Sequence, residues 1–337
     1  MLSIALAAAI AAQQEPIVPI VRPGKDGRGR DPWVFRCIFE DRTRMLILAL
    51  AKDWWLAFNP ETCAVHKVWN GAMDYRGKVW DFSQDNSRAD GRIYLNSPSE
   101  MWRLPSEALP EGWKQDGVVW DKDGWLFTTN GSSLTSGAYD ASSWQRVFLA
   151  FDETGRKARF KATIFDELTK VSPQFFESAT HVDNESAWQW NFKRIELPTS
   201  TMRVRVESPI AGKKLRSLRL YGDRPSWLGS DGKPLNLLWQ GYDLINQTKG
   251  VSIRYEVQHP KKFAVAVVQS MDLTDSGWFE TFEVSGLPLG ESIFLRREGL
   301  SERVDVRTNL DLAQGTFAFR SDGKHRIDFT LPAGERR

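Results

Sequence analysis

Four histidines are the residues best suited to acid–base or metal chemistry in this chain of 337 residues. They are His66, His181, His259 and His325, and no two are closer than 66 residues. None has the spacing of a metal-binding motif such as H-x-H or H-E-x-x-H. A metal site or a histidine-based triad would therefore have to be assembled by the fold alone. We predict no metal site and no cofactor, with each histidine a satisfied strand or surface residue.

The other short motifs that could carry catalysis are incomplete. The segment 24–27 (GKDG) follows no strand pattern and matches neither the P-loop nor the dinucleotide fingerprint. The segment 121–124 (DKDG) resembles the start of a calcium loop, but the third acidic position and the closing glutamate are missing. A hairpin turn is the better interpretation of that segment. Ser132 lacks the G-x-S-x-G context of a nucleophile. Among 43 acidic residues, no carboxylate pair stands out as a glycosidase pair.

Tryptophan is the residue type that points most directly to a binding role. The chain has 15 tryptophans, and eight of them fall between positions 54 and 125. A tryptophan is more often core than surface, but an exposed ring offers a flat apolar platform for a sugar or a partner strand. Trp54 and Trp55 are adjacent, so on a strand their rings face opposite sides. The candidate binding residues are Trp54, Trp69, Trp80 and Trp125.

Charge and composition exclude one class of partner. The chain has 45 basic and 43 acidic residues, a formal net charge of +2, and the two signs are interleaved. The one biased run, 22–30 (RPGKDGRGR), is short and glycine-rich and is typical of a linker. No electrostatic footprint for nucleic acid is present, so we expect no nucleic-acid partner.

The N-terminal segment predicts export. Residues 1–12 (MLSIALAAAIAA) are apolar and end in small residues, with an A-x-A pattern at 9–11, although a basic n-region is missing. We interpret 1–12 as a secretory signal peptide, with a disordered N-terminus as the alternative, and 13–32 as a linker. The run is too short to cross a bilayer, and we predict no membrane span. The expected location is the periplasm or the cell surface.

Two cysteines, Cys37 and Cys63, are the only sulfhydryl residues. Neither belongs to a C-x-x-C or C-x-x-C-H motif, which excludes a zinc ribbon, a thioredoxin-like site and covalently attached haem. In an exported protein such a pair usually forms a disulfide. We therefore predict a strand-to-strand disulfide, with two separate buried thiols as the alternative.

The pattern after the linker predicts an all-β protein of antiparallel sandwiches. Short aromatic and β-branched runs such as WVFRCIF, RMLILAL, CAVHKVW and GWLFTT alternate with turn residues. The turns are expected at Asn59-Pro60, Asn70-Gly71, Arg76-Gly77, Asp90-Gly91 and Asp123-Gly124. No amphipathic helix longer than two turns is evident. The first folded unit is predicted to be a tryptophan-rich β domain over 33–139.

Residues 140–337 contain a pattern that predicts an internal duplication of about 90 residues. The segments WQWNFKRIELP and WFETFEVSGLP share Trp, then Phe four positions on, then Leu-Pro, and the tetrapeptide SDGK also occurs twice at the corresponding shift. We predict repeats at 140–230 and 231–321, each covering the apolar face of the other, and a closing strand at 322–331.

The stretch beginning PWVFRCIF resembles an uncharacterised β-rich domain of large secreted bacterial proteins. The similarity rests on W-V-F-R at Trp33, the strand 44–50, W-L-A-F at Trp55 and the run 66–71 (HKVWNG). In those proteins the domain accompanies c-type cytochrome or quinoprotein sugar-dehydrogenase-like modules, and coverage here is about 33–300. This chain has no C-x-x-C-H, and we expect no attached module. The resemblance implies an exported accessory role and no redox activity of its own.

Three functions remain open from the sequence. The first is an exported non-catalytic β module that binds carbohydrate or docks onto a redox or hydrolytic partner protein. The second is a carbohydrate-active enzyme, an epimerase, lyase or hydrolase, on a large antiparallel β scaffold. A cleft in which His66 or His181 meets carboxylates would favour this second function. The third is a structural envelope protein.

Overall fold

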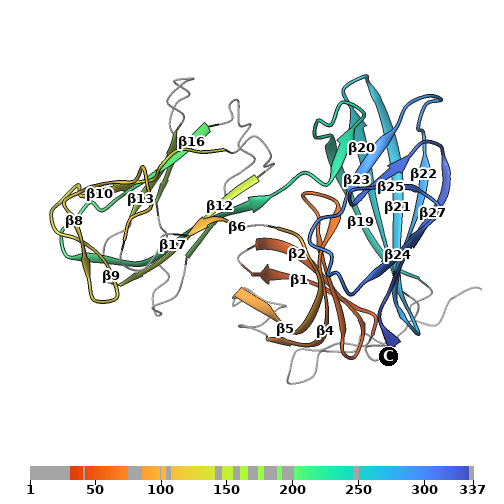
Figure 1. The fold of residues 1–337 in the computed structure, drawn as a ribbon, viewed down its shortest axis with the longest axis horizontal. Helices are drawn as coiled ribbons and strands as arrows, with labels where there is room; N and C mark the ends of the chain where they lie inside the picture. Colours follow the sequence, from red (N-terminus) through yellow and green to blue (C-terminus); the bar gives the residue numbers. More distant parts are fainter. Residues whose placement is uncertain are drawn as a thin grey trace, which may run out of the picture.

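The computed structural model describes residues 31–40, 42–74, 86–98, 100–103, 108–140, 146–154, 160–165, 174–177, 188–191, 201–245 and 250–333. The expected signal peptide, most of the expected linker, Trp80 and His181 lie outside these residues. Within them the regular structure is strand, with no α-helix. The strands pair antiparallel except where β1 meets β5 (Figure 1). The prediction of an all-β, antiparallel protein is confirmed.

The first unit is a closed five-stranded barrel in which the strands follow chain order. Its strands are β1 (Trp33–Phe39), β2 (Arg42–Ala51), β3 (Trp54–Asn59), β4 (Ala64–Asp74) and β5 (Asn86–Asn96). Side chains alternate across each strand, so every second residue points inward. The interior contains Trp55 and Trp69, whose rings stack at 5.9 Å, together with Phe39, Ile47 and Met73.

The outer face of the barrel is apolar too, which explains why β3 is buried along its whole length. Leu46, Leu48, Trp54 and Phe58 point outward and join one continuous core with the C-terminal sheets. Trp54 and Trp55 therefore do lie on opposite faces of β3, as expected, and both faces are covered. Burial on two sides is possible because a second β unit packs against the barrel wall.

Two of the predicted turns are in fact strand interiors. Gly71 in β4 and Gly91 in β5 lie directly opposite each other. A Cβ on Gly71 would stand 2.5 Å from the backbone oxygen of Asp90, and both glycines have positive φ angles, 138° and 154°. Glycine here allows two backbones to approach closely rather than reversing the chain. The Asn70-Gly71 and Asp90-Gly91 turn predictions are wrong for this reason.

The middle unit is a sandwich of two six-stranded sheets. One sheet runs β14-β13-β16-β10-β7 with β11 paired to β16, and the other runs β15-β12-β17-β9-β8 with β6 paired to β17. The strands are β6 (Glu100–Arg103), β7 (Lys114–Asp116), β8 (Val118–Asp121), β9 (Gly124–Phe127), β10 (Ser133–Thr135), β11 (Tyr139–Asp140), β12 (Arg146–Thr154), β13 (Lys161–Phe165), β14 (Gln174–Glu177), β15 (Trp188–Asn191), β16 (Thr201–Glu207) and β17 (Lys213–Asp223).

The expected domain boundary at 139/140 falls inside this middle sandwich. Before the boundary, β10 pairs with β16 and β9 pairs with β17, both of which follow it. Strands β7 and β8 join the same sheets by pairing with β10 and β9. The described chain therefore passes from the barrel to the middle sandwich between β5 and β6, after Asn96. Sequence pattern could not locate this change because the strands on both sides of it have the same short, turn-bounded character.

The C-terminal unit is a sandwich of a four-stranded sheet, β18-β23-β26-β25, and a six-stranded sheet, β19-β20-β21-β22-β27-β24. Its strands are β18 (Trp227–Gly229), β19 (Asn236–Leu244), β20 (Val251–His259), β21 (Phe263–Thr274), β22 (Gly277–Ser285), β23 (Ile293–Arg296), β24 (Asp305–Thr308), β25 (Asp311–Ala313), β26 (Thr316–Phe319) and β27 (Gly323–Thr330). The predicted closing strand at 322–331 corresponds to β27, which lies between β22 and β24.

Two sandwiches do follow each other, but their strand orders differ. Of the matched tryptophans, Trp188 is the first residue of β15 and Trp278 the second residue of β22. The pairs Phe151-Asp152 and Tyr242-Asp243, which recur at a similar spacing, lie on β12 and β19. Strand β12 pairs directly with β15, whereas β19 and β22 are separated by β20 and β21. The sheets therefore do not repeat one strand order over 140–230 and 231–321.

The recurring SDGK tetrapeptides also have different roles. Asp231 accepts a hydrogen bond from the backbone of Lys233 within its own turn. Asp322 instead accepts bonds from the backbone N–H groups of Gly286 and Leu287, in the connection between β22 and β23, and these bonds lower the pKa of its carboxyl group. The shared tetrapeptide therefore does not mark a shared structural role.

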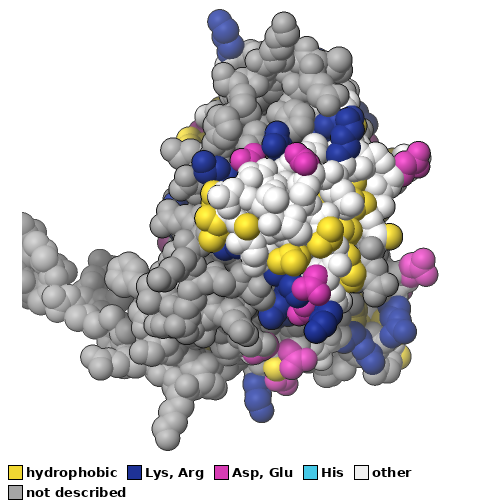
Figure 2. Space-filling model, turned by 90° about the vertical axis from the view of Figure 1, so that its left-hand side faces the viewer, with side chains coloured by type: hydrophobic (Ala, Val, Ile, Leu, Met, Phe, Trp, Pro, Cys, Tyr) yellow, Lys and Arg dark blue, Asp and Glu magenta, His cyan; other side chains and the backbone are white. Residues whose placement is uncertain are grey.

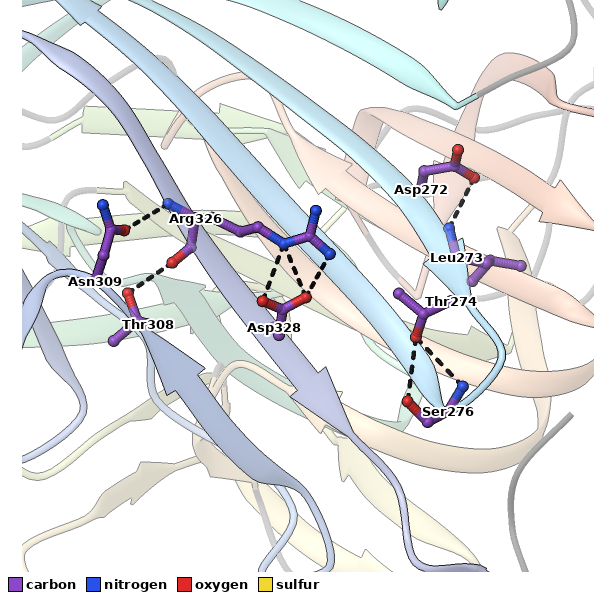
Figure 3. Close-up of polar contacts among 8 residues, drawn as sticks. All are labelled: Asp272, Leu273, Thr274, Ser276, Thr308, Asn309, Arg326 and Asp328. Atoms are coloured by element: carbon purple, nitrogen blue, oxygen red, sulfur yellow. Dashed lines mark hydrogen bonds and ion pairs between the residues drawn. The ribbon is translucent and has the colours of Figure 1, made fainter.

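The edge strand β24 is held to β27 by polar contacts on the sheet surface (Figure 3). The hydroxyl of Thr308 donates to the backbone oxygen of Arg326, and the Arg326 N–H donates to the side chain of Asn309. The Arg326 guanidinium forms a forked ion pair with Asp328 and lies 4.0 Å from the centre of the Phe279 ring. This arginine is therefore engaged within its own sheet.

Candidate functional site

The tryptophans nominated as platforms are core residues wherever the structure describes them. Trp54, Trp69 and Trp125 are 4%, 0% and 4% exposed. Trp69 fills the barrel interior, Trp54 stacks on Tyr94 under the C-terminal unit, and Trp125 belongs to the middle sandwich. The expectation of an exposed ring among these three is wrong, because the barrel strands that carry Trp54 and Trp69 are covered on both faces and Trp125 is buried within the middle sandwich. Trp80 lies outside the described residues.

The predicted disulfide is not formed. Cys37 lies inside the barrel, whereas Cys63 belongs to the core between the barrel and the C-terminal sandwich. A barrel wall stands between the two environments, so the thiols face different cores. Burial raises the pKa of both cysteines, which keeps them as neutral, unreactive thiols. The alternative of two separate buried thiols is the correct one.

The DKDG segment is a hairpin turn, as predicted. Asp121 pairs with Gly124 to close the β8–β9 hairpin, and Lys122 has a positive φ of 55°. The ammonium group of Lys214 lies 3.0 Å from the Asp121 carboxylate and 2.9 Å from that of Asp123. Lys214 occupies the position that a cation would need, and it lowers the pKa of Asp123. Among the described residues no group of His, Cys, Asp and Glu has the arrangement of a metal site.

The described histidines are scattered over three strands. His66 is on β4, His259 ends β20, and His325 is on β27. The His259 ring stacks on Phe263 at 4.4 Å, and His325 bonds to the backbone oxygen of Ser321. These two histidines are satisfied strand residues, as the sequence predicted.

His66 does meet carboxylates, but in a very small space. It lines a polar cavity of about 30 Å³ together with Asp223 and Glu298, where the barrel meets the start of the C-terminal sandwich. Such a volume holds one or two water molecules. Both carboxylates are already paired, Asp223 with Arg42 at 2.9 Å and Glu298 with Arg224 at 3.0 Å. This cavity is a small polar space at the joint between units, and it is too small to admit a substrate.

A larger groove is lined by residues of the barrel and of strand β19. Arg36, Leu46 and Phe58 lie side by side on the outer face of β1, β2 and β3, because they are direct cross-strand partners. Leu46 and Phe58 are covered by the C-terminal sandwich, and Arg36, one strand further out, lies beyond that cover. Trp239 of β19 packs on Phe58 with ring centres 5.8 Å apart.

The groove has an apolar wall and a charged wall. Its volume is about 190 Å³, and it is lined by Arg36, Arg44, Pro60, Glu61, Leu237 and Trp239. Leu237 and Trp239 are half-buried, so part of each side chain remains open to the groove. Arg36, Arg44 and Glu61 are exposed. An aromatic ring beside guanidinium and carboxylate groups is an arrangement that can stack on a sugar ring and bond its hydroxyls.

The apolar wall continues along β19 beyond the groove. Trp239 pairs with the buried Tyr255, and Tyr242 and Leu244 pair with other buried residues of β20, so all three point to the same face. Tyr242 and Leu244 are exposed, although the residues that pair with them on β20 belong to the core. In the sheet order of the described strands, β19 lies at an edge. A strip of Leu237, Trp239, Tyr242 and Leu244 therefore follows an open sheet edge.

The middle sandwich presents a more mixed surface. Val119 and Ile210 are large apolar side chains exposed on this unit. Figure 2 shows that the described side chains on this side of the molecule combine apolar residues with both signs of charge. The groove beside β19, which has both an apolar and a charged wall, is therefore the candidate site developed below.

Sequence reasoning missed Trp239 because it stands apart from the crowded region 54–125. A usable signal was nevertheless present in the run NLLWQGYDL, which keeps large apolar residues at alternate positions and then shifts at Gly241. The groove could not be recognised without knowing how the barrel packs beside β19, because Arg36 and Arg44 come from strands some 200 positions earlier in the chain.

Comparison with known proteins identifies no family. No protein-family model matches the chain, and no curated protein matches it in sequence. Among solved structures, a cycloisomaltooligosaccharide glucanotransferase of Paenibacillus sp. shares 8% identity at a TM-score of 0.24, over 69% of this chain and 46% of that protein. The chain thus matches less than half of the enzyme's length.

A second solved structure is the CBM22-1-CBM22-2 tandem domain of Xyn10C from Paenibacillus barcinonensis. It shares 13% identity at a TM-score of 0.24, over 71% of this chain and 88% of that one. Neither likeness bears on what this chain binds. No helix among the described residues has the length and apolar character needed to cross a bilayer.

Proposed function

We propose that this protein is an exported, non-catalytic β module that binds carbohydrate in the groove between the barrel and β19. The observation that carries the proposal is Trp239, an aromatic ring open to a groove whose other wall bears charged side chains. Sugar rings present apolar C–H faces and hydroxyl edges. The apolar wall of the groove complements the faces, and the charged wall complements the hydroxyl edges.

Rigid positioning of the groove supports this role. Trp239 rests on Phe58, and Phe58 is fully buried in the core shared by the barrel and the C-terminal sandwich. The binding surface is therefore formed before any ligand arrives, which reduces the entropy cost of association. The exposed Tyr242 further along β19 provides a second aromatic contact for a chain of sugars rather than a single ring.

The test is a titration of the full chain with a panel of soluble polysaccharides, in which calorimetry or affinity electrophoresis measures the binding. We expect weak but saturable binding that Trp239→Ala reduces at least tenfold, and that Trp239→Phe preserves in part. Leu238→Ala is the matched control, because Leu238 is exposed on the same strand but points to the opposite face. Thermal unfolding of each variant checks that the fold is kept.

Flat titrations across the panel, or equal affinity in the Trp239→Ala and Leu238→Ala proteins, would overturn the proposal. Docking onto a secreted redox or hydrolytic partner is the alternative use of this edge, since an open strand can pair with another chain. A partner that is captured equally by the wild-type protein and by Trp239→Ala, together with flat titrations, would favour that alternative. Export itself is tested by sequencing the N-terminus of the protein recovered from a periplasmic fraction.

A further inference from the structure

We infer that the groove selects acidic sugar chains, whose carboxylate groups are held by Arg36 and Arg44 while a ring rests on Trp239. This inference rests on the proposed carbohydrate-binding function and adds the class of ligand. It starts from the charge of the groove lining, which contains two guanidinium groups and one carboxylate, that of Glu61.

Arg44 stands at a local irregularity between β1 and β2, and Arg36 lies in the regular part of β1 just before it. The register of this strand pair shifts between Cys37 and Phe39, and Arg44 adopts a left-handed conformation with φ of 61°. A non-glycine residue in this region carries a conformational cost. Arg36 and Arg44 line the same groove, so two cations from adjacent strands face one space.

Neither arginine is neutralised within the part of the chain that the structure describes. Among the described residues, neither Arg36 nor Arg44 forms an ion pair, whereas other exposed arginines do. Arg320 binds Asp311 at 2.9 Å, and Arg326 binds Asp328. The groove lining holds two guanidinium groups against the single carboxylate of Glu61, so a bound anion would balance the remaining positive charge.

A carboxylate on a sugar ring fits this arrangement better than a neutral sugar does. A guanidinium group is planar and offers paired N–H donors that match the two oxygens of a carboxylate. A neutral sugar would displace water from both arginines without supplying charge. Glu61, on the turn that ends β3, leaves the groove with one excess positive charge and can accept bonds from ring hydroxyls.

The experiment compares polygalacturonate with the same polymer after methyl esterification, using the full chain at low and at physiological salt. We expect at least tenfold tighter binding of the free acid, with the difference decreasing as salt screens the charges. Arg36→Gln combined with Arg44→Gln should abolish the preference, so that the free acid and the esterified polymer bind with equal affinity. Arg320→Gln, which removes one exposed arginine outside the groove lining, is the control and should preserve the preference.

Equal affinity for the two polymers, or a preference that survives in the double variant, would overturn the inference while leaving the proposed function intact. A sulfated polymer bound as tightly as the uronate and lost in the same double variant would also overturn it, because charge alone would then suffice. Tight binding of polyglutamate without binding of any polysaccharide would overturn both proposals and indicate an acidic peptide partner. The supporting pattern has two parts. Trp239→Ala loses binding of both polymers, and the double arginine variant loses only the preference for the free acid.

Discussion

The guanidinium of Arg42, at the start of β2, lies 2.9 Å from the carboxylate of Asp223, at the end of β17, and both side chains are 3% exposed. Arg42 also donates to the backbone oxygen of Gly222 at 3.1 Å. This buried ion pair connects the barrel to the last strand of the middle sandwich across 181 positions of sequence. It fixes the joint at which the chain leaves the middle unit for the C-terminal unit.

Replacing one partner of this pair should destabilise the protein strongly. Arg42→Met would leave the Asp223 carboxylate buried without its counter-ion, which costs about 3–5 kcal/mol in comparable sites. Arg320→Met is the matched control, since its pair with Asp311 is exposed and such pairs contribute about 0–1 kcal/mol. Urea unfolding of both variants measures the difference. Equal unfolding midpoints in the two variants would contradict the structural role assigned to Arg42.

The buried His66 should make the protein less stable in mild acid. Its pKa is held well below the ordinary value by burial first, and then by the nearby positive charges of Arg42 and Lys67. In the unfolded chain the imidazole takes a proton below about pH 6.5, whereas in the folded protein it stays neutral. The unfolded state then binds more protons, so the free energy of unfolding falls as the pH drops below that value.

Substituting His66 should remove this contribution. We expect the wild-type protein to lose up to about 1.4 kcal/mol of stability per pH unit from this group between roughly pH 6.5 and 5. In His66→Gln the slope over that interval should be shallower by a corresponding amount. Denaturant unfolding at several pH values provides the measurement. Parallel stability curves for the two proteins would show that His66 is solvated and titrates normally.

The two cysteines should behave as free, protected thiols. Cys37 and Cys63 are buried in different cores, and burial raises the pKa of each. Without reductant, a chromogenic thiol reagent should react with neither residue in the native protein and with two thiols per chain after unfolding in guanidinium. Cys63→Ala should reduce the number of thiols that react after unfolding from two to one. An unfolded wild-type chain with no titratable thiol would demonstrate the disulfide that the structure does not contain.

Local features of the sequence predicted the elements that depend on local chemistry. The hairpin of β8 and β9 follows from Asp123-Gly124 between two apolar runs, and the opposed rings of Trp54 and Trp55 follow from the two-residue period of a strand. The closing strand β27 was recognisable from HRIDFTL for the same reason. Each of these predictions concerns residues within about a dozen positions of one another.

Predictions that required knowledge of neighbouring strands were less successful. The signal at Asn70-Gly71 is identical for a turn and for a glycine that admits a facing backbone, and only the partner Gly91 distinguishes them. The SDGK tetrapeptides and the Trp-x-x-x-Phe segments indicated a duplication, yet β12 and β19 have different partners. Backbone hydrogen bonds are the same whichever strand supplies them, so pairing is not encoded by any short motif.

The sequence by itself determined the type of structure: alternating apolar residues and Gly, Asn and Asp turns restrict each segment to a short strand, whatever surrounds it. Only the tertiary structure decided which aromatic rings are covered. The C-terminal sandwich buries the outer wall of the barrel, including Trp54, and leaves Trp239 open beside Arg36 and Arg44. Burial depends on how whole units pack, and that packing is the sum of many distant contacts rather than a property of any one segment.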